Sequence, residues 1–234
     1  MAVGILLSRI FGLVRQRVLS HYLGLSDAGD AFAAAFRIPN FLQNLLGEGV
    51  LSASFIPVYA RLRAEGRDEE AHHVAQAVFG VLALVTAIVV LGGVVLAGPL
   101  TKVIAVGFSD AKCELTVRLV RILFPGAGLL VLSAWCLGVL NSHRRFLLAY
   151  TAPVVWNAAI IATCVLGPGT RGETGSAIAA AVGSVLGSAL QFGGQLPVVL
   201  ALLGRLRPTL DARSAELRKV LRNFGPVLVG RGAS

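Results

Sequence analysis

From residue 74 to residue 98 the chain contains the uncharged run VAQAVFGVLALVTAIVVLGGVVLAG, which is 25 residues long. The hydrocarbon core of a bilayer is about 30 Å thick and takes about 20 helical residues, so such a run predicts a helix that crosses a membrane. Three further runs, at residues 122–141, 146–170 and 174–204, are also uncharged and at least 20 residues long. The sequence therefore predicts four membrane-spanning helices.

The overall composition agrees with a membrane protein. Of the 234 residues, 56% are hydrophobic and 14% are charged, whereas a soluble domain carries about 45–50% apolar and about 25% charged residues. The net charge of +9 would suit a nucleic-acid partner, but such proteins carry a basic patch on a charged, soluble surface, which the uncharged runs exclude. Cys113, Cys136 and Cys164 show neither a disulfide framework nor metal-ligand spacing.

Two more long apolar segments carry charges. Residues 1–24 contain three arginines inside the apolar run, which argues against a cleaved signal peptide, and residues 31–60 contain Arg37 and Glu48. Residues 217–234 have the pattern of a further span that is not completed. The predicted fold is an all-α integral membrane protein with six transmembrane helices in residues 1–204, a cytoplasmic loop at 205–216, and the truncated start of a seventh helix at 217–234.

Basic residues predict the orientation of the spans. Loops after the second, fourth and sixth predicted spans carry eleven of them: Arg61, Arg63, Arg67, Arg144, Arg145, Arg205, Arg207, Arg213, Arg218, Lys219 and Arg222. The other loops carry Lys102, Lys112 and Arg171, and Arg118 and Arg121 directly precede the fourth predicted span. Because cytoplasmic loops are enriched in Lys and Arg, this bias places the N-terminus in the cytoplasm.

The second predicted span, residues 31–60, and the residue just before it carry an aligned set of charges. Asp30 and Arg37 are seven positions apart, and Arg37 and Glu48 are eleven apart. At 100° per residue, both spacings fall within about 20° of whole turns, so the three side chains share one face over about 27 Å of helix. A single ion pair would suffice for a structural role, whereas a stripe of this length indicates a hydrated lumen.

The same segment is expected to be interrupted. Pro39 removes a backbone donor, and Gly47 and Gly49 flank Glu48. Broken helices at membrane depth occur where the freed backbone lines a cavity, and transporters place substrate sites there. Residues 37–49 are therefore the predicted site-bearing element, although an interruption weakens the alignment of Glu48 with Arg37.

The first predicted span contains Arg9, Arg15 and Arg17, which point in different directions around a helix. Arg17 is expected to reach the headgroups, and one alternative is that all three anchor the helix at the interface. Arginine suits bidentate recognition of phosphate, so Arg9, Arg15 and Arg37 facing inward would form a site for an anionic headgroup. In the sixth span, Gly183, Gly187 and Gln191 predict a close helix contact with an interhelical hydrogen bond.

Several motifs together resemble the MurJ (MviN) family of lipid II flippases. In the second span they are Asp30-Ala-Phe32, Phe36-Arg-Ile-Pro-Asn40, Gly47-Glu-Gly49 and Ser54-Phe-Ile-Pro-Val58. The likeness extends in order through Ser8-Arg-Ile-Phe-Gly-Leu-Val-Arg15, Leu140-Asn-Ser-His-Arg-Arg-Phe146, Pro153 with Asn157, Leu190-Gln191, Gln195-Leu-Pro197 and Val220-Leu-Arg-Asn-Phe-Gly-Pro226. The resemblance covers nearly the whole chain.

This resemblance implies a fourteen-helix transporter of the multidrug/oligosaccharidyl-lipid/polysaccharide exporter superfamily, with a MATE-like fold. Two six-helix lobes form a V around a cationic cavity, and a lipid-linked disaccharide-pentapeptide crosses by alternating access. Arg9 and Arg15 match functional arginines of the family, Asp30 and Glu48 match its acidic positions, and Arg37 matches a basic position. Gln43 stands where the family has a further cavity arginine. The chain is thus expected to form the N-terminal lobe.

The resemblance also implies where substrate would bind and what drives transport. The expected substrate contacts are Arg9, Arg15, Asp30, Arg37, Asn40, Gln43 and Glu48. Asp30 and Glu48 would pair with the arginines or form a gating ion pair. The sequence has no nucleotide-binding or catalytic motif, so we expect a transporter rather than an enzyme, with no cofactor, driven by a coupling ion or the membrane potential.

The leading prediction is therefore a lipid II flippase of the bacterial inner (plasma) membrane, with its N-terminus in the cytoplasm. Its partners would be lipid II, which is an undecaprenyl-pyrophosphate-linked disaccharide-pentapeptide, and the bilayer, with no nucleic acid and a monomeric full-length protein. The alternatives are an exporter of another lipid-linked glycan and an inactive pseudo-flippase or membrane scaffold. A drug-cation exporter would require acidic rather than arginine-rich cavity residues.

Overall fold

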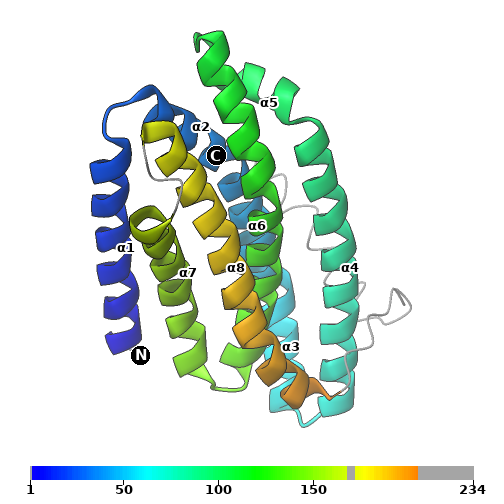
Figure 1. Cartoon of the computed structure of the whole chain (residues 1–234). Helices are drawn as coiled ribbons and strands as arrows, with labels where there is room; N and C mark the ends of the chain where they lie inside the picture. The colour runs from blue at the N-terminus through cyan, green and yellow to red at the C-terminus, as the bar shows by residue number, and fades with distance from the viewer. Residues whose placement is uncertain (1, 168–171, 205–234) are drawn as a thin grey trace.

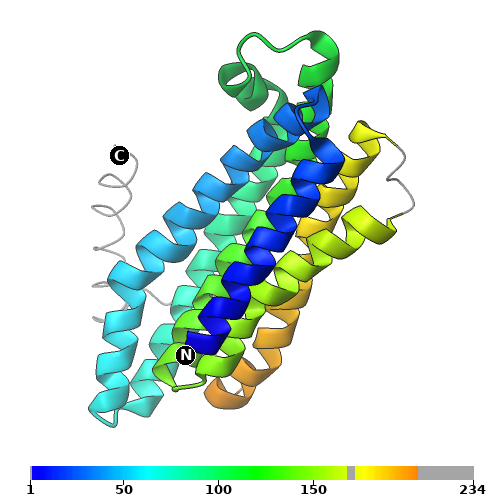
Figure 2. The ribbon, with the colours of Figure 1, turned by 90° about the vertical axis from the view of Figure 1, so that its left-hand side faces the viewer.

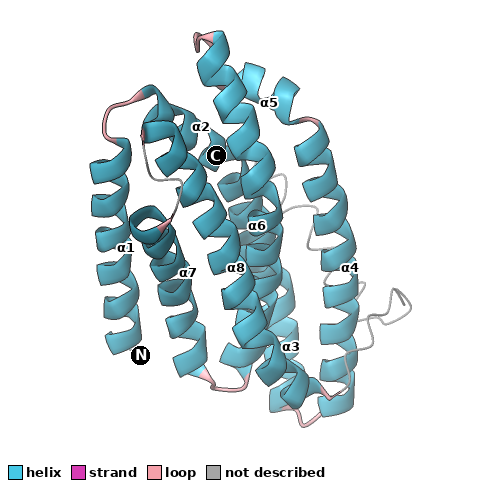
Figure 3. Cartoon of the chain, in the orientation of Figure 1, coloured by secondary structure: helices cyan, strands magenta, loops and turns pink. Residues whose placement is uncertain are grey.

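A computed structural model describes residues 2–167 and 172–204 of the chain, and all of the regular structure there is helical (Figures 1 and 3). The elements in order are α1 (Ala2–Leu23), α2 (Asp27–Leu42), η1 (Gln43–Phe55), α3 (Ile56–Ala64), α4 (Asp68–Val95), α5 (Ala97–Ile104), α6 (Asp110–Ser142), α7 (Phe146–Leu166) and α8 (Glu173–Leu203). The predicted loop at 205–216 and the predicted seventh helix at 217–234 lie outside the described residues.

Four of these helices are long and apolar enough to cross a membrane: α4, α6, α7 and α8. They contain the four uncharged runs, apart from a few residues at the ends of those runs, and confirm those helices. The two charged segments are also helical, as α1 and as α2 with η1 and α3. These two segments are less continuously apolar than the four helices above: α1 carries three arginines, and the second segment is divided by η1. The structure therefore supports an all-helical membrane fold without establishing six spans.

The second segment is one continuous helix that changes its winding. The backbone stays helical at both junctions, with φ −60° and ψ −45° at Gln43 and φ −58° and ψ −45° at Ile56. Pro39 lies inside α2 and does not end it, so the predicted break at this proline is wrong. The irregularity is instead the π-helical section η1, in which each turn holds more residues than in an α-helix. The 100° spacing that aligned Glu48 with Arg37 therefore does not apply across η1.

The helices form a bundle with two distinct ends (Figure 2). At the lower end, as drawn in Figure 1, lie the start of α1, the α3–α4 turn, the α6–α7 turn and the end of α8. At the upper end lie the α1–α2 turn, α5 and the starts of α6 and α8. The short helix α5 occupies what the sequence predicts to be a loop. Successive long elements thus run in alternating directions, as a membrane bundle requires.

The core of the bundle is centred on α6, which packs against α2, α4 and α8. Trp135 of α6 is fully buried, and its indole Nε1 donates a hydrogen bond to the Ala75 carbonyl of α4 at 3.2 Å. Gln191 of α8 donates to the Ser133 hydroxyl of α6 at 2.8 Å, which confirms the predicted interhelical bond. α1 packs mainly on α7, and this leaves room for a cavity between α1 and α2.

Candidate functional site

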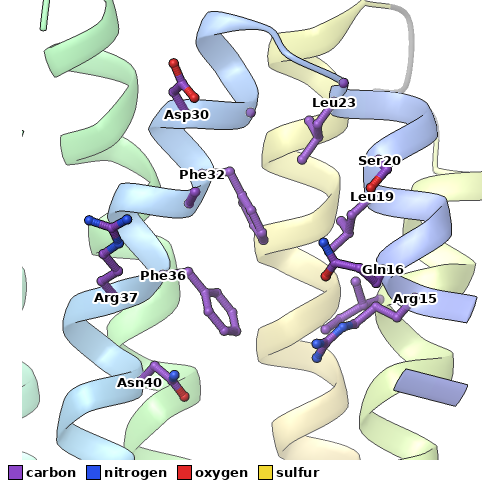
Figure 4. Close-up of a pocket in the computed structure, with 14 residues that line it drawn as sticks. Arg15, Gln16, Leu19, Ser20, Leu23, Asp30, Phe32, Phe36, Arg37 and Asn40 are labelled. Carbon is purple, nitrogen blue, oxygen red and sulfur yellow. The ribbon is translucent and has the colours of Figure 1, made fainter. Parts of the chain in front are cut away.

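A cavity of about 380 Å³ lies between α1 and α2 near the upper end of the bundle (Figure 4). Ile160 of α7 also lines it. α2 begins beside this cavity because Ser26 caps it: the Ser26 hydroxyl accepts a hydrogen bond from the Gly29 amide at 3.1 Å. The preceding turn depends on Gly24, whose φ of +53° favours glycine. This turn and cap set the first two turns of α2, including Asp30, against the end of α1.

The cavity brings together four of the seven predicted site residues: Arg15, Asp30, Arg37 and Asn40. Gln43 lines a smaller adjoining cavity of about 10 Å³, whose wall also includes Asn40. Arg9 is exposed on α1 and does not line the larger cavity. The side chain of Glu48 lies outside the described part of the structure, so its predicted role remains a prediction.

Arg15 is the most enclosed arginine of the cavity. Its guanidinium carbon lies 4.9 Å from the centre of the Trp156 ring, which is within the range of a cation–π contact. Its Nε is buried and has no hydrogen-bond partner among the described residues. Arg37 of α2 lines the cavity as well and is exposed. Within residues 2–167 and 172–204, neither arginine is part of an ion pair.

Asp30 has a partner that the sequence did not indicate. Lys112, from the first turn of α6, lies 2.6 Å from the Asp30 carboxylate and 2.9 Å from that of Asp27. The side chain of Lys112 is only 12% exposed, and its ammonium also lies 4.5 Å from the Phe108 ring centre. The expectation that Asp30 pairs with an arginine is therefore not met in this structure. Asp30 and Lys112 instead tie the start of α2 to the start of α6.

Sequence reasoning also missed the aromatic residues at the cavity: Phe32 and Phe36 line it, and Trp156 contacts Phe36 and Arg15 without lining it. Phe36 lines both cavities, and its ring centre lies 5.6 Å from that of Phe32 and 6.1 Å from that of Trp156. The only sequence signal for Trp156 was a rare tryptophan in an otherwise apolar span, next to Asn157. Asn157 itself is buried and donates to the Pro153 carbonyl at 2.8 Å, so it serves α7 rather than this cavity.

The site combines two guanidinium groups and a carboxamide with the aromatic rings of Phe32 and Phe36. Guanidinium groups present paired donors that match phosphate oxygens, and they do so best where bulk water is partly excluded. No group of three or more potential metal ligands occurs in the described residues. The arrangement can bind an anionic headgroup.

A second polar cluster lies at the lower end, where α3 meets the end of α6. Arg63 Nη2 contacts His143 Nδ1 at 3.3 Å, and Tyr59 Oη lies 2.8 Å from His143 Nε2. Because a guanidinium can only donate, Nδ1 must accept, so Nε2 carries the proton and donates to Tyr59. Burial lowers the pKa of His143 below its ordinary value of 6.5, and the charge of Arg63 lowers it further. This imidazole is therefore held neutral.

Comparison with known proteins identifies the family. The sequence model described as "Lipid II flippase MurJ" matches residues 19–234. The lipid II flippase MurJ of Burkholderia cenocepacia is 34% identical over 227 residues, which cover 94% of this chain and 44% of that protein. The probable lipid II flippase MurJ of Bdellovibrio bacteriovorus is 34% identical over 241 residues, covering 99% of this chain and 45% of that protein.

Solved structures show the same fold. A lipid II flippase MurJ in an inward closed conformation superposes with a TM-score of 0.75 at 23% identity, covering 98% of this chain and 48% of that one. A MOP superfamily transporter from Pyrococcus furiosus gives a TM-score of 0.70 at 18% identity, covering 100% of this chain and 52% of that one. The chain spans a little under half the length of the curated relatives it matches. On the family match across residues 19–234, this chain belongs to the lipid II flippase MurJ family.

Proposed function

We propose that this protein moves lipid II from the cytoplasmic to the outer leaflet of the bacterial plasma membrane. The observation that carries the proposal is the placement of Arg15 and Arg37 on one cavity between α1 and α2, in a chain of the MurJ family. In this proposal the described helices form the N-terminal lobe, and α1 and α2 supply one wall of an alternating-access cavity. The substrate contacts would be the cavity residues together with Arg9, Gln43 and Glu48.

The physical task of such a protein is to carry a charged headgroup through a layer that excludes charge. A pyrophosphate leaving water for hydrocarbon loses its hydration, and guanidinium donors replace part of it. Lowering this barrier requires no covalent step, so the protein acts as a transporter rather than an enzyme. The membrane potential supplies about 2.3 kcal/mol per charge per 100 mV, and it or a coupling ion would drive the cycle.

The basic residues of the described turns support a cytoplasmic lower end. The α3–α4 and α6–α7 turns and the adjoining end of α3 carry Arg61, Arg63, Arg67, Arg144 and Arg145. The segment from the end of α4 to the first turn of α6 carries Lys102 and Lys112. By the positive-inside rule this distribution favours an N-terminus in the cytoplasm.

The proposal is tested by complementation of a strain depleted of its own lipid II flippase. The gene that encodes this sequence should restore growth, and Arg15→Ala or Arg9→Ala should abolish the rescue at equal protein level. Arg17→Ala is the matched control for Arg15→Ala, because Arg17 lies on the same helix, is exposed and does not line the cavity. Arg9→Ala tests the family resemblance, in which Arg9 but not Arg17 matches a functional arginine. Normal growth with both Arg9→Ala and Arg15→Ala would contradict the proposal. Rescue of a strain that lacks an exporter of a different lipid-linked glycan would instead indicate that this glycan is the substrate.

A further inference from the structure

The guanidinium of Arg15 rests on an aromatic ring that comes from another helix. Arg15 belongs to α1 and Trp156 to α7, and the two helices pack against each other. The guanidinium carbon is 4.9 Å from the ring centre. Figure 4 shows the Arg15 side chain extending from α1 into the space that faces α2. The ring thus lies where it can fix the direction in which this long, flexible side chain points.

The Trp156 ring is itself fixed from three sides. Its Nε1 donates to the Ser184 carbonyl of α8 at 3.1 Å. Gly187 of α8 lies so close that a Cβ there would be 2.9 Å from Trp156 Cα and from Trp156 Cδ1. Phe36 of α2 packs beside it, with ring centres 6.1 Å apart. The indole is therefore a rigid platform held by α8 and α2.

A guanidinium on an aromatic face keeps its donors available. Its N–H groups point outward in the plane, so a cation–π contact leaves them free for an anion. The buried Nε of Arg15 has no hydrogen-bond partner among the described residues, so no protein acceptor competes for this donor. The ring contact holds the face of the guanidinium while Arg15 lines the cavity, which places its donors where a phosphate could bind.

We propose that Trp156 is a positioning residue that holds Arg15 in the orientation required to bind a lipid-linked pyrophosphate. The inference rests on the proposed function and deepens it, because it adds to the site a residue that makes no charged contact with the headgroup. A cation–π contact of ordinary strength corresponds to about a twofold to thirtyfold change in affinity. Trp156→Leu removes the platform, and Trp156→Phe keeps a smaller aromatic face.

The test uses the full chain purified in detergent and farnesyl pyrophosphate as the probe. Trp156→Leu should weaken binding about twofold to thirtyfold, and Trp156→Phe should restore part of it. In an Arg15→Ala background, Trp156→Leu should cause no further loss, because its effect acts through Arg15. Trp135→Phe is the control for loss of a buried tryptophan, since Trp135 is bonded to Ala75 in the core.

Fluorescence gives a second readout that a merely structural role would not produce. The chain has two tryptophans, so in the Trp135→Phe protein the emission comes from Trp156 alone. Addition of farnesyl pyrophosphate should change this emission, and Arg15→Ala should abolish the change.

The outcomes separate the inference from the proposed function. No binding of farnesyl pyrophosphate or of lipid II by the unmodified chain would count against the proposed function. Binding that depends on Arg15 but is unchanged by Trp156→Leu would overturn the inference alone. A Trp156→Leu loss that persists undiminished in the Arg15→Ala background would also overturn it, because the residue would then act on the fold. If Trp156→Leu fails to fold, Trp156→Phe and the fluorescence titration decide.

Discussion

At the scale of single residues, Lys112 sets how much negative charge lies beside the cavity arginines. It binds the Asp30 carboxylate at 2.6 Å, and Asp30 lines the same cavity as Arg15 and Arg37. Without this lysine, the Asp30 carboxylate would lower the positive potential at both arginines. Lys112 shares its single charge between Asp30 and Asp27, so it offsets part of the negative charge beside the arginines.

Lys112→Ala should therefore weaken binding of farnesyl pyrophosphate by up to about fivefold, the range of an exposed ion pair. Lys112→Arg should retain most of the affinity, because it keeps the charge beside Asp30. Lys102→Ala is the matched control, since Lys102 is an exposed lysine of α5 outside the cavity lining. Isothermal titration of the purified chain measures the effect. Equal affinities for Lys112→Ala and Lys102→Ala would show that Asp30 does not influence the site.

His143 makes the lower end sensitive to acid. Burial and the charges of Arg63, His72 and Arg145 lower its pKa below 6.5, and only Asp68 opposes them. The unfolded chain therefore takes up a proton at a higher pH than the folded chain does, and the folded state loses stability as the pH falls below about 6.5. Protonation also places an N–H on Nδ1 against the Arg63 guanidinium.

The unfolding temperature in detergent should fall between about pH 7.5 and about pH 5.5. His143→Gln should reduce this fall, because the amide keeps a donor and an acceptor without titrating. His73→Gln serves as the control at an exposed histidine of α4. The same pH dependence in both variants would rule out His143 as its source.

At the scale of elements, the contact between α7 and α8 positions Trp156, the ring that Arg15 rests on. A Cβ at Gly187 would lie 2.9 Å from the Trp156 backbone, and a Cβ at Gly183 would overlap the Thr163 hydroxyl. Both glycines are needed for close approach of the helices, which confirms the predicted contact. Separation of α7 from α8 would also displace the ring under Arg15.

Gly187→Ala should destabilise the chain by about 1–3 kcal/mol, because it overpacks a contact between two backbones. Gly193→Ala on the same helix has open space around it and should be neutral. Thermal unfolding of the two variants in the same detergent compares them directly. Identical unfolding temperatures would mean that the close contact between α7 and α8 contributes nothing to the free energy of unfolding.

The helices were predictable where composition alone decides, and site residues were predictable where a charge or amide interrupts an apolar segment. Uninterrupted apolar runs mark α4, α6, α7 and α8 because hydrocarbon tolerates few charges. Arg37 and Asn40 were found because both stand in one short motif of an otherwise apolar helix, Phe36-Arg-Ile-Pro-Asn40. Trp156 and Lys112 were missed because they come from α7 and α6. Helices that are apolar on all sides carry no periodic signal that fixes their rotation or their neighbours.

The π-helical section was also beyond the sequence argument. Pro39 suggested a break, yet α2 continues through it. The winding changes at Gln43 instead, beside the close approach of Gly47 to Ala134, where a Cβ on Gly47 would lie 3.2 Å from that of Ala134. The change in winding therefore coincides with close packing against α6. The helix propensities of residues 43–55 do not predict it.

At the scale of the whole molecule, the orientation in the membrane can be tested directly. Cys136 and Cys164 are buried and Cys113, in the first turn of α6, is half-buried, so Cys113→Ser gives a background with little reactivity. In that background, Ser109→Cys should react with an impermeant maleimide from outside the cell. Glu65→Cys, in the α3–α4 turn, should react only after the membrane is opened. The reverse pattern would invert the topology derived from the basic turns.

The most direct test of the central claim is where lipid II appears when this protein is the cell's only flippase. In cells depleted of their own flippase, expression of the gene that encodes this sequence should make lipid II accessible to an externally added enzyme that cleaves its pyrophosphate. Arg15→Ala at equal expression should leave lipid II protected inside. Lipid II that stays protected with the unmodified protein, despite membrane insertion and normal synthesis of the precursor, would contradict the account.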